Sequence, residues 1–464
     1  MFETAVYVDR RRRLADSVDT GLALFLGHDD APLNYRDNHY PFHQDATFRY
    51  LWGLNEAGLA ATLDFDTGAE VLYGHEPTLE DIVWTGPLPS LAERGAHIGV
   101  DDCRDTSKLV HDVRAALESG RKIHILPQYR GDARLKLSGL LGIAPDELDV
   151  HASEELIRAI VPLRAAKEER EVREIERALE VSFETHTAAM RETRPGRYEW
   201  EVVRAVEATH ARLGSPLSFP IIFSVRGEVL HNHAHENLME AGQLVVHDSG
   251  ATSPRGYASD ITRTFPVAGT FDTRQREVYE IVLRALEEAS DAVKPGTPFI
   301  DVYKTAARSQ MAGLKELGLV KGDVHEAVEL GAHAAFLQCG TGHMVGLDVH
   351  DMESLGEDFV GYDDTVQRSE LFGVAYVRLG RALEEDWVVA VEPGIYFIPD
   401  LIDRWSAEGK FADFVNWPQV NAYRDFGGIR IEDDLLVTAD GHRLLGPPIP
   451  KTVADVEATM AEAT

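Results

Sequence analysis

The segment that decides the fold is residues 244–265, LVVHDSGATSPRGYASDITRTF. One apolar run ends at Asp248, and another begins just after Asp260. The intervening sequence SPRG is typical of a turn. We therefore expect a hairpin that brings the two acids onto adjacent antiparallel strands. Facing carboxylates repel each other unless a proton or a cation lies between them. The alternative is that both acids lie on solvated strand ends.

A second candidate site is the segment 340–351, GTGHMVGLDVHD, which is rich in glycine and histidine. Histidine is the commonest metal ligand and a frequent acid–base group, and glycine lets the backbone approach a ligand closely. A single histidine is more often structural. Because His343 and His350 both lie beside glycines and acids, a structural and a functional interpretation stay open.

Two further acids follow β-branched runs, in residues 391–394 (VEPG) and 429–434 (IRIEDD). Taken alone, Glu392 and Glu432 could simply meet solvent at the ends of strands. In the second run, the alternation of a strand places Arg430 and Glu432 on one face. We expect the arginine to lie beside Glu432 and to help keep it ionised.

Together these motifs supply four carboxylates and one imidazole. Such donors suit hard or borderline divalent ions such as Mn²⁺, Co²⁺ or Zn²⁺. Four carboxylates exceed the charge that one ion needs, and they suit a pair of ions about 3.5–4 Å apart, which polarises a carbonyl and activates water. The candidate donors are Asp248, Asp260, His343, Glu392 and Glu432.

Residues 231–237, HNHAHEN, could form a local metal cluster or a polar loop. The sequence has neither a Gly-x-Ser-x-Gly motif nor a glycine-rich phosphate loop followed by Lys-Ser/Thr. Hydrolysis by bound metal is therefore favoured over serine or nucleotide chemistry.

Composition restricts the partners and the compartment. The 464 residues carry 46 Lys and Arg against 78 Asp and Glu, a net charge of −32. This charge argues against nucleic acid or an anionic membrane surface as a partner. Cys103 and Cys339 form no disulfide framework, no apolar run approaches membrane-spanning length, and we expect no signal peptide. The sequence thus predicts a cytoplasmic protein.

Apolar periodicity predicts two domains, with a boundary near residues 160–170. The first alternates short strands with helices, which predicts an α/β domain. The second mixes hairpins with long amphipathic helices, which predicts an α+β domain. Predicted strands are 22–26, 60–63, 71–73, 123–126, 221–225, 244–247, 262–267, 388–391, 395–397 and 429–432. Predicted helices are 106–119, 166–194, 274–293, 305–317 and 324–336.

The order and spacing of the five donor motifs resemble the pita-bread metallopeptidases, most closely the Xaa-Pro aminopeptidases (aminopeptidase P) and the prolidases. Residues 40–45 (YPFHQD) and 53–56 (GLNE) resemble the aminopeptidase P N-terminal domain. The resemblance implies an α/β N-terminal domain, residues 1–165, plus an α+β pita-bread (creatinase/aminopeptidase-like) catalytic domain, residues 166–464. It also implies a homodimer or homotetramer.

The resemblance assigns roles residue by residue. The five donors would hold two ions, usually Mn²⁺, bridged by Asp260 and Glu432. His231 would orient the substrate and stabilise the tetrahedral intermediate, and His350 would contact its proline side. Arg430 would support the ligands, and Glu392 would also act as general base. One departure stands out, because Cys339 occupies a position where the family often has histidine.

The implied reaction is hydrolysis of the bond between an N-terminal residue and proline in a peptide. That bond is a tertiary amide without an N–H. The N-terminal domain and the sequence SDITRTFPV favour an aminopeptidase, whereas the Phe426-Gly427-Gly428 run favours a prolidase (Xaa-Pro dipeptidase). A non-catalytic binding protein and a metal-free hydrolase on the same fold are disfavoured, because all five donors are present. The long segment 352–386 is expected to be a surface loop or an oligomer contact.

Overall fold

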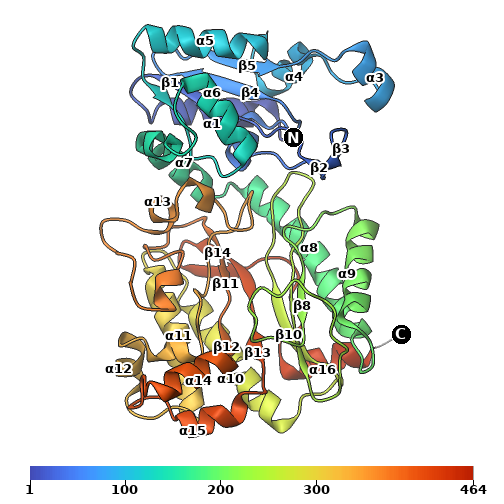
Figure 1. Ribbon diagram of the computed structural model, residues 1–464, viewed down its shortest axis with the longest axis vertical. Coiled ribbons are helices and arrows are strands. Elements are labelled where there is room, and N and C mark those ends of the chain that lie inside the picture. The colour runs from blue at the N-terminus through green and yellow to red at the C-terminus, as the bar shows by residue number, and fades with distance from the viewer. Residues whose placement is uncertain (463–464) are drawn as a thin grey trace. The chain divides into compact units, whose positions relative to one another are not determined.

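The structure is a computed structural model that describes residues 1–462 (Figure 1). Contacts divide the chain into two units. The first contains residues 1–164 and 352–360, and the second contains residues 165–351 together with the chain from residue 361 onward. The short segment 352–360 therefore belongs with the first unit although it lies far along the sequence.

The first unit is built on a five-stranded mixed sheet in the order β6-β5-β4-β1-β7. The β1–β4 and β4–β5 pairs are antiparallel, while β5–β6 and β1–β7 are parallel. Its core contains Leu24, Val71, Val113 and Leu137, so the helices α5 (Ser107–Glu118) and α6 (Gly131–Leu141) contribute to the packing. The predicted α/β class is confirmed. The strands are β1 Leu22–Leu26, β4 Ala60–Asp64, β5 Glu70–Gly74, β6 Asp102–Asp105 and β7 Ile123–His124, with a separate hairpin β2 Pro32–Tyr35 and β3 Asn38–His39.

Helices follow the strands of this unit, and short polar side chains begin several of them. Asp45 accepts a hydrogen bond from the Phe48 N–H (2.7 Å) at the start of α2, and Gly53, at φ 69°, ends that helix. Such caps satisfy backbone groups that the helix leaves unpaired. The helices are α1 Thr4–Ala15, α2 Ala46–Trp52, α3 Leu79–Thr85, α4 Leu91–Ile98, α5 Ser107–Glu118, α6 Gly131–Leu141, η1 Leu148–His151 and α7 Glu154–Ala165.

The second unit is α+β, as predicted, and its strands form three small antiparallel groups. Their orders are β10-β9-β8, β11-β14-β15 and β12-β13. The strands are β8 Ile222–Ser224, β9 Leu244–Asp248, β10 Thr262–Pro266, β11 Val388–Val391, β12 Gly394–Tyr396, β13 Gly428–Arg430, β14 Asp433–Thr438 and β15 Gly441–Leu444.

Long helices accompany these strands (Figure 1). The helix α8 buries Val172, Ile175 and Leu179 on one face, as its apolar spacing predicts. The other helices are α9 Glu199–Leu213, α10 Thr273–Asp291, α11 Phe299–Glu316, α12 Val324–Glu329, η2 Ala332–Ala335, η4 Val374–Tyr376, α14 Pro399–Ala407, α15 Trp417–Val420, η5 Asn421–Tyr423 and α16 Val453–Ala461, and α8 spans Glu169–Glu192. Within residues 1–462, no helix has both the length and the apolar character needed to cross a bilayer.

Two predicted helices differ from the structure. The helix expected at 305–317 begins earlier, at Phe299, directly after Pro298, whose fixed φ suits a helix start. The helix expected at 324–336 stops at Glu329, because Gly331 adopts φ 80°, and a short 3₁₀ turn follows.

The segment 352–386 is not a uniform surface loop. It contains η3 Glu353–Leu355 and α13 Glu357–Gly361, and its later part buries Val377 and Leu379. The segment is therefore only partly the expected surface loop, since apolar side chains inside it pack into the protein, and the oligomer contact stays a prediction.

Candidate metal centre

All five predicted donors line one cavity of about 400 Å³ in the second unit. They arrive from separate places: the end of β9, the turn before β10, a loop after η2, the end of β11 and the link between β13 and β14. His231, His350 and Arg430 line the same cavity. The fold therefore brings together every residue that the sequence singled out as a candidate for this site.

The hairpin of β9 and β10 positions the first two acids. The strands are antiparallel and pair Thr262 with Asp248. Asp260 lies two residues before β10, in the turn and not on the strand as expected. Its backbone N–H donates to Asp434 Oδ2 (3.0 Å), which fixes the turn. Asp248 and Asp260 are both buried.

His343 is held so that one ring nitrogen faces the acids. Its Nδ1 lies 3.0 Å from the carbonyl oxygen of Met344, so Nδ1 carries the proton and donates it. Nε2 then faces the carboxylates, 3.4 Å from Asp260 Oδ2 and 3.9 Å from Glu392 Oε1. A hydrogen bond that fixes the tautomer in this way is typical of metal-binding histidines.

A glycine allows this loop to lie against β11. A Cβ at Gly342 would lie 2.1 Å from the carbonyl oxygen of Ala390. The Ala390 N–H donates to the His343 carbonyl (2.9 Å), and the Glu392 N–H donates to the Thr341 carbonyl (3.0 Å). The close approach therefore sets His343 beside Glu392.

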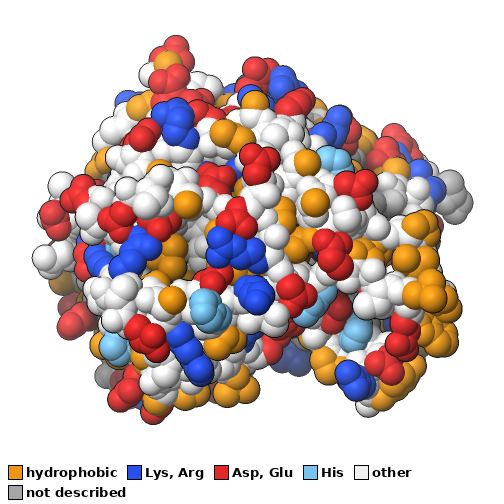
Figure 2. All heavy atoms as spheres, turned by 90° about the horizontal axis from the view of Figure 1, so that it is seen from above, with side chains coloured by type: hydrophobic (Ala, Val, Ile, Leu, Met, Phe, Trp, Pro, Cys, Tyr) orange, Lys and Arg blue, Asp and Glu red, His pale blue; other side chains and the backbone are white. Residues whose placement is uncertain are grey.

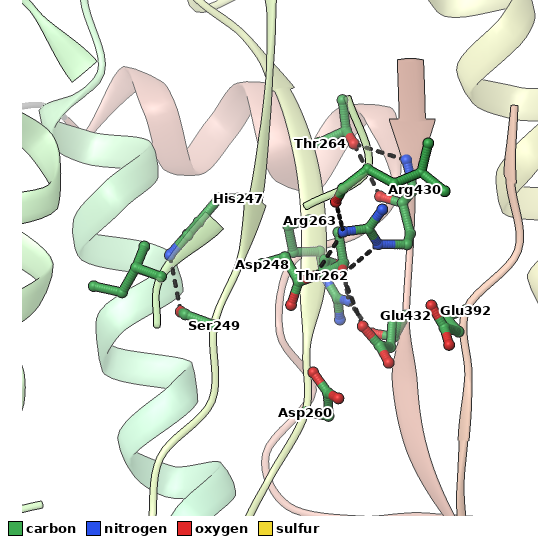
Figure 3. Close-up of polar contacts among 12 residues, drawn as sticks. His247, Asp248, Ser249, Asp260, Thr262, Arg263, Thr264, Glu392, Arg430 and Glu432 are labelled. Carbon is green, nitrogen blue, oxygen red and sulfur yellow. Dashed lines mark hydrogen bonds and ion pairs between the residues drawn. The ribbon is translucent and has the colours of Figure 1, made fainter. Parts of the chain in front are cut away.

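Glu432 completes the cluster from the other side. Its carboxylate accepts a hydrogen bond from Thr262 Oγ1 (2.7 Å), and its N–H donates to the Thr262 carbonyl (3.1 Å). Figure 3 shows its side chain between those of Asp260 and Glu392. Three groups have potential donor atoms within 4.8 Å of one another: Asp248, Asp260 and Glu432; His343, Glu392 and Glu432; and Asp260, His343 and His350.

The electrostatics of the cluster favour a cation. Burial, together with the neighbouring acids, raises the pKa of Asp260 and of Glu432 well above their usual values. Burial also raises the pKa of Glu392. Asp248 Oδ1 is buried and has no hydrogen-bond partner. Carboxylates and one imidazole are ordinary ligands of hard or borderline divalent ions, so the residues present fit such a group.

The guanidinium of Arg430 has a different partner from the one expected. Its Nη2 donates to Asp248 Oδ2 (2.6 Å), its Nε to Thr262 Oγ1 (3.0 Å) and its Nη1 to Tyr396 Oη (2.9 Å). The expected pairing with Glu432 was wrong, because β13 ends at Arg430 and the strand alternation does not reach Glu432. The two side chains are instead connected through the Thr262 hydroxyl (Figure 3).

The two remaining candidate histidines lie at the cavity in different ways. The ring of His350 stacks on that of His343, with centroids 3.8 Å apart and an interplanar angle of 13°. His231 lies on the exposed loop between β8 and β9, on the wall of the cavity. His235 Nε2 and His233 Nδ1 lie 3.1 and 3.4 Å from the Ile221 carbonyl, contacts that support the polar-loop interpretation of residues 231–237.

Sequence reasoning missed several residues of the site. Asp434 accepts the Asp260 N–H, and burial raises its pKa to about 7. The acidic run that follows Ile431 could have identified Asp434 as a candidate site residue. Tyr376 and Arg378 line the cavity from η4 and the segment that follows it, where no motif marks them. Cys339, which the sequence had already marked, also lines the cavity, and burial raises its thiol pKa to about 12.

Comparison with known proteins defines the class. Residues 173–439 match the model of metallopeptidase family M24, and residues 7–125 match that of the aminopeptidase P N-terminal domain. The chain belongs to metallopeptidase family M24. The predicted enzyme class and the pita-bread fold class are therefore confirmed.

Individual relatives cover nearly the whole chain. The Xaa-Pro aminopeptidase of Escherichia coli is 31% identical over 98% of this chain and 97% of its own length. The human Xaa-Pro dipeptidase is 30% identical over 98% of this chain and 93% of its own length. A structure of Zn-substituted E. coli aminopeptidase P in complex with product matches with a TM-score of 0.80 and 28% identity, covering 100% of this chain and 99% of that one. Proline aminopeptidase P II of Yersinia pestis matches with a TM-score of 0.80, 29% identity and coverage of 99% and 100%.

Proposed function

We propose that this protein is an Xaa-Pro aminopeptidase, which hydrolyses the bond between an N-terminal residue and the proline that follows it. The observation that carries this proposal is the meeting of four carboxylates and one imidazole in a single cavity. The similarity to the E. coli Xaa-Pro aminopeptidase over nearly the whole chain supports it. Residues 1–165 would form the N-terminal domain and residues 166–464 the catalytic domain, in keeping with the two family matches.

Two divalent ions, with Mn²⁺ preferred over Co²⁺ or Zn²⁺, would be held by the five donors. When bound, they would supply Lewis-acid activation of the scissile carbonyl and of water. Asp260 and Glu432 would contribute to holding both ions, because they are the two carboxylates that occur in more than one of the donor groups. The buried guanidinium of Arg430, which contacts Asp248, would hold that carboxylate in place at the ions.

Side chains of the protein would then transfer the proton and bind the substrate. The Glu392 side chain is 20% exposed, more than those of Asp248 and Asp260, so it is the most accessible of these three acids. It would take a proton from the attacking water and pass it to the proline nitrogen, which must be protonated to leave as an amine. His231 and His350, on the cavity wall, would orient the substrate and hydrogen-bond the developing oxyanion and the proline side.

We further propose that the protein forms a homodimer or homotetramer in the cytoplasm. The helix α3 supports self-association, since none of its residues is buried and Leu79, Val83 and Trp84 are 78%, 72% and 79% exposed. Figure 2 shows apolar side chains gathered along one side of the surface. Contiguous exposed apolar surface is typical of an interface. The two cysteines, which are free, are consistent with a reducing compartment.

A dipeptidase is the second candidate, and one residue favours it. Arg378 lines the cavity as a second guanidinium besides Arg430. A dipeptide ending in proline carries its carboxylate next to the scissile bond, and a cation on the cavity wall would bind that carboxylate. The human Xaa-Pro dipeptidase relative is consistent with this alternative.

A direct assay separates the two activities. Purified protein with Mn²⁺ is given Xaa-Pro dipeptides and Xaa-Pro-Yaa tripeptides of the same Xaa, and the release of Xaa is measured. We expect the tripeptides to be cleaved at least as fast as the dipeptides. Cleavage of dipeptides alone would contradict the aminopeptidase proposal, and cleavage of neither would contradict both.

A further inference from the structure

The candidate site is supported by a buried ion pair that includes none of the five donors. Lys167 Nζ lies 3.0 Å from Asp351 Oδ2, and only 1% of each side chain is exposed. Lys167 lies just before α8, and Asp351 directly follows His350, so the pair joins positions 184 residues apart. A buried ion pair adds little net stability, because desolvation of both charges offsets their attraction. We therefore expect this ion pair to act by fixing the positions of neighbouring residues.

Asp351 holds together the turn formed by residues 344–351. Its N–H donates to the Met344 carbonyl (2.9 Å) and closes the turn. Its Oδ1 accepts the Asp348 N–H (3.3 Å) inside the turn. A Cβ at Gly346 would lie 2.4 Å from Asp351 Oδ2, so the carboxylate fills the space that this glycine leaves. The position of the carboxylate thus determines the shape of the turn.

Lys167 is itself anchored to the strand that ends at a candidate ligand. Its N–H donates to the Asp386 carbonyl (2.8 Å), and the preceding Ala166 forms a β-bridge with Trp387. The strand β11 begins at the next residue and leads to Glu392. Lys167 therefore connects the strand that carries Glu392, through its backbone, to the turn that carries His350, through its side chain.

We propose that Lys167 is a positioning residue: through Asp351 it sets the imidazole of His350 against that of His343 in the cavity. His343 directly precedes the turn and His350 lies within it beside Asp351, and their rings stack with centroids 3.8 Å apart. The kinetic part of this inference rests on the proposed function, since His350 is assigned there to the substrate. A displaced His350 would lower turnover even when the metal ligands are intact.

The test compares two variants. Lys167→Met removes the buried cation beside the Asp351 carboxylate and should lower both Tm and kcat. Lys167→Met/Asp351→Asn removes the buried negative charge as well, yet the side-chain amide oxygen that it introduces can still accept the Asp348 N–H. We expect the double variant to recover most of the Tm, while its kcat for an Xaa-Pro-Yaa peptide stays about 10- to 100-fold below wild type. Its Kd for Mn²⁺ by calorimetry should change by no more than about twofold, because all five donors are retained.

The control is Lys304→Met, which breaks a partly exposed pair with Glu329 (2.7 Å) and should change neither kcat nor Tm. Recovery of full kcat in the double variant would show that the pair serves stability alone and would overturn the proposal. So would a fall in kcat that merely follows a loss of Mn²⁺ binding.

A second measurement does not depend on catalysis. In metal-free protein with ¹⁵N-labelled histidine, the imidazole resonances of His350, assigned with His350→Gln, should shift in the double variant and stay in place in Lys304→Met. Unshifted resonances would overturn the inference. If wild type cleaves no Xaa-Pro peptide, the proposed function fails, and this spectrum still decides whether Lys167 positions His350.

Discussion

Arg430 Nη2 lies 2.6 Å from Asp248 Oδ2, and this buried contact places a guanidinium directly against one of the acids of the site. Desolvation opposes the charge of Arg430, but Tyr396, Asp248 and Glu392 raise its pKa well above the usual value. The same side chain reaches Glu432 only through the hydroxyl of Thr262. The cluster is therefore already partly neutralised by the protein before any cation binds.

Replacing Arg430 with Met should destabilise the metal-free protein strongly. Breaking a buried pair by removing one partner leaves an uncompensated charge and costs about 3–5 kcal/mol. Urea unfolding of metal-free protein measures the change. The control Arg443→Met breaks an exposed pair with Glu176 (2.5 Å) and should cost less than about 0.5 kcal/mol. Equal losses in the two variants would show that Arg430 is not compensating the cluster.

Much of this arrangement was predictable, and the failures have physical causes. The acids of the donor motifs stand at the ends of apolar runs, and a period-two pattern of apolar residues locates strands well. Asp248, Glu392 and the hairpin could therefore be predicted from the sequence. The partner of Arg430 was not, because a strand's alternation holds only while the strand lasts, and β13 ends at that residue. Arg378 and Lys167 carry no local motif, and only tertiary packing brings them near the site.

Replacing Glu432 with Gln should separate metal binding from folding. Burial and neighbouring acids raise the pKa of Glu432, so its charged form is disfavoured without a cation. Glutamine keeps an acceptor for the Thr262 hydroxyl and removes one charge. Metal-free Glu432→Gln should therefore be at least as stable as wild type, while the stabilisation by excess Mn²⁺, about 2.7 kcal/mol at 100-fold Kd, should largely disappear.

Calorimetric scans with and without Mn²⁺ measure both quantities for Glu432→Gln. Glu408→Gln, at the exposed end of α14, is the matched control and should keep the wild-type response to Mn²⁺. A Glu432→Gln protein that Mn²⁺ stabilises as much as wild type would exclude Glu432 from the ligand set.

Replacing Cys339 with Ser should leave metal binding unchanged. Cys339 lines the cavity but belongs to none of the groups of clustered donor atoms among residues 1–462. Burial raises its thiol pKa to about 12, so almost none of it is the reactive thiolate at neutral pH. Iodoacetamide should therefore modify Cys339 more than about tenfold slower than a small-molecule thiol at pH 8. Rapid alkylation, followed by mass spectrometry of the peptide, would contradict this environment.

Two buried histidines, one on α8 and one on β9, should make the free energy of unfolding fall at acid pH. His186 stacks on His247 with ring centroids 4.2 Å apart, and burial lowers the pKa of His186 from 6.5 to about 3. The unfolded chain then binds more protons than the folded one between these values. Stability is therefore complete above about pH 6.5 and falls as the pH drops toward 3.

Replacing His186 with Leu tests this directly. Urea unfolding at pH 7 and pH 5 should show a smaller loss of stability on acidification in His186→Leu than in wild type, by up to about 1.4 kcal/mol per pH unit. At pH 7 the variant should already be weaker, because the Ser249 carbonyl loses its imidazole partner. His111→Leu, at an exposed site, should keep the wild-type pH dependence. An unchanged dependence in His186→Leu would show that this ring is not the acid-sensitive group.

The exposed helix α3 gives a prediction about assembly. A side chain such as Trp84, which is 79% exposed, leaves a large apolar area in water, and burying it between subunits would favour association by the usual gain of about 25 cal/mol per Å². Trp84→Glu would place a charge in that contact and should shift the protein toward a smaller species in light scattering at micromolar concentration. Leu135→Glu, at another exposed apolar position on α6, should leave the mass unchanged. A wild-type protein that is monomeric at all concentrations would contradict the proposed self-association, whereas a Trp84→Glu variant with the same mass as wild type would place the contact elsewhere than α3.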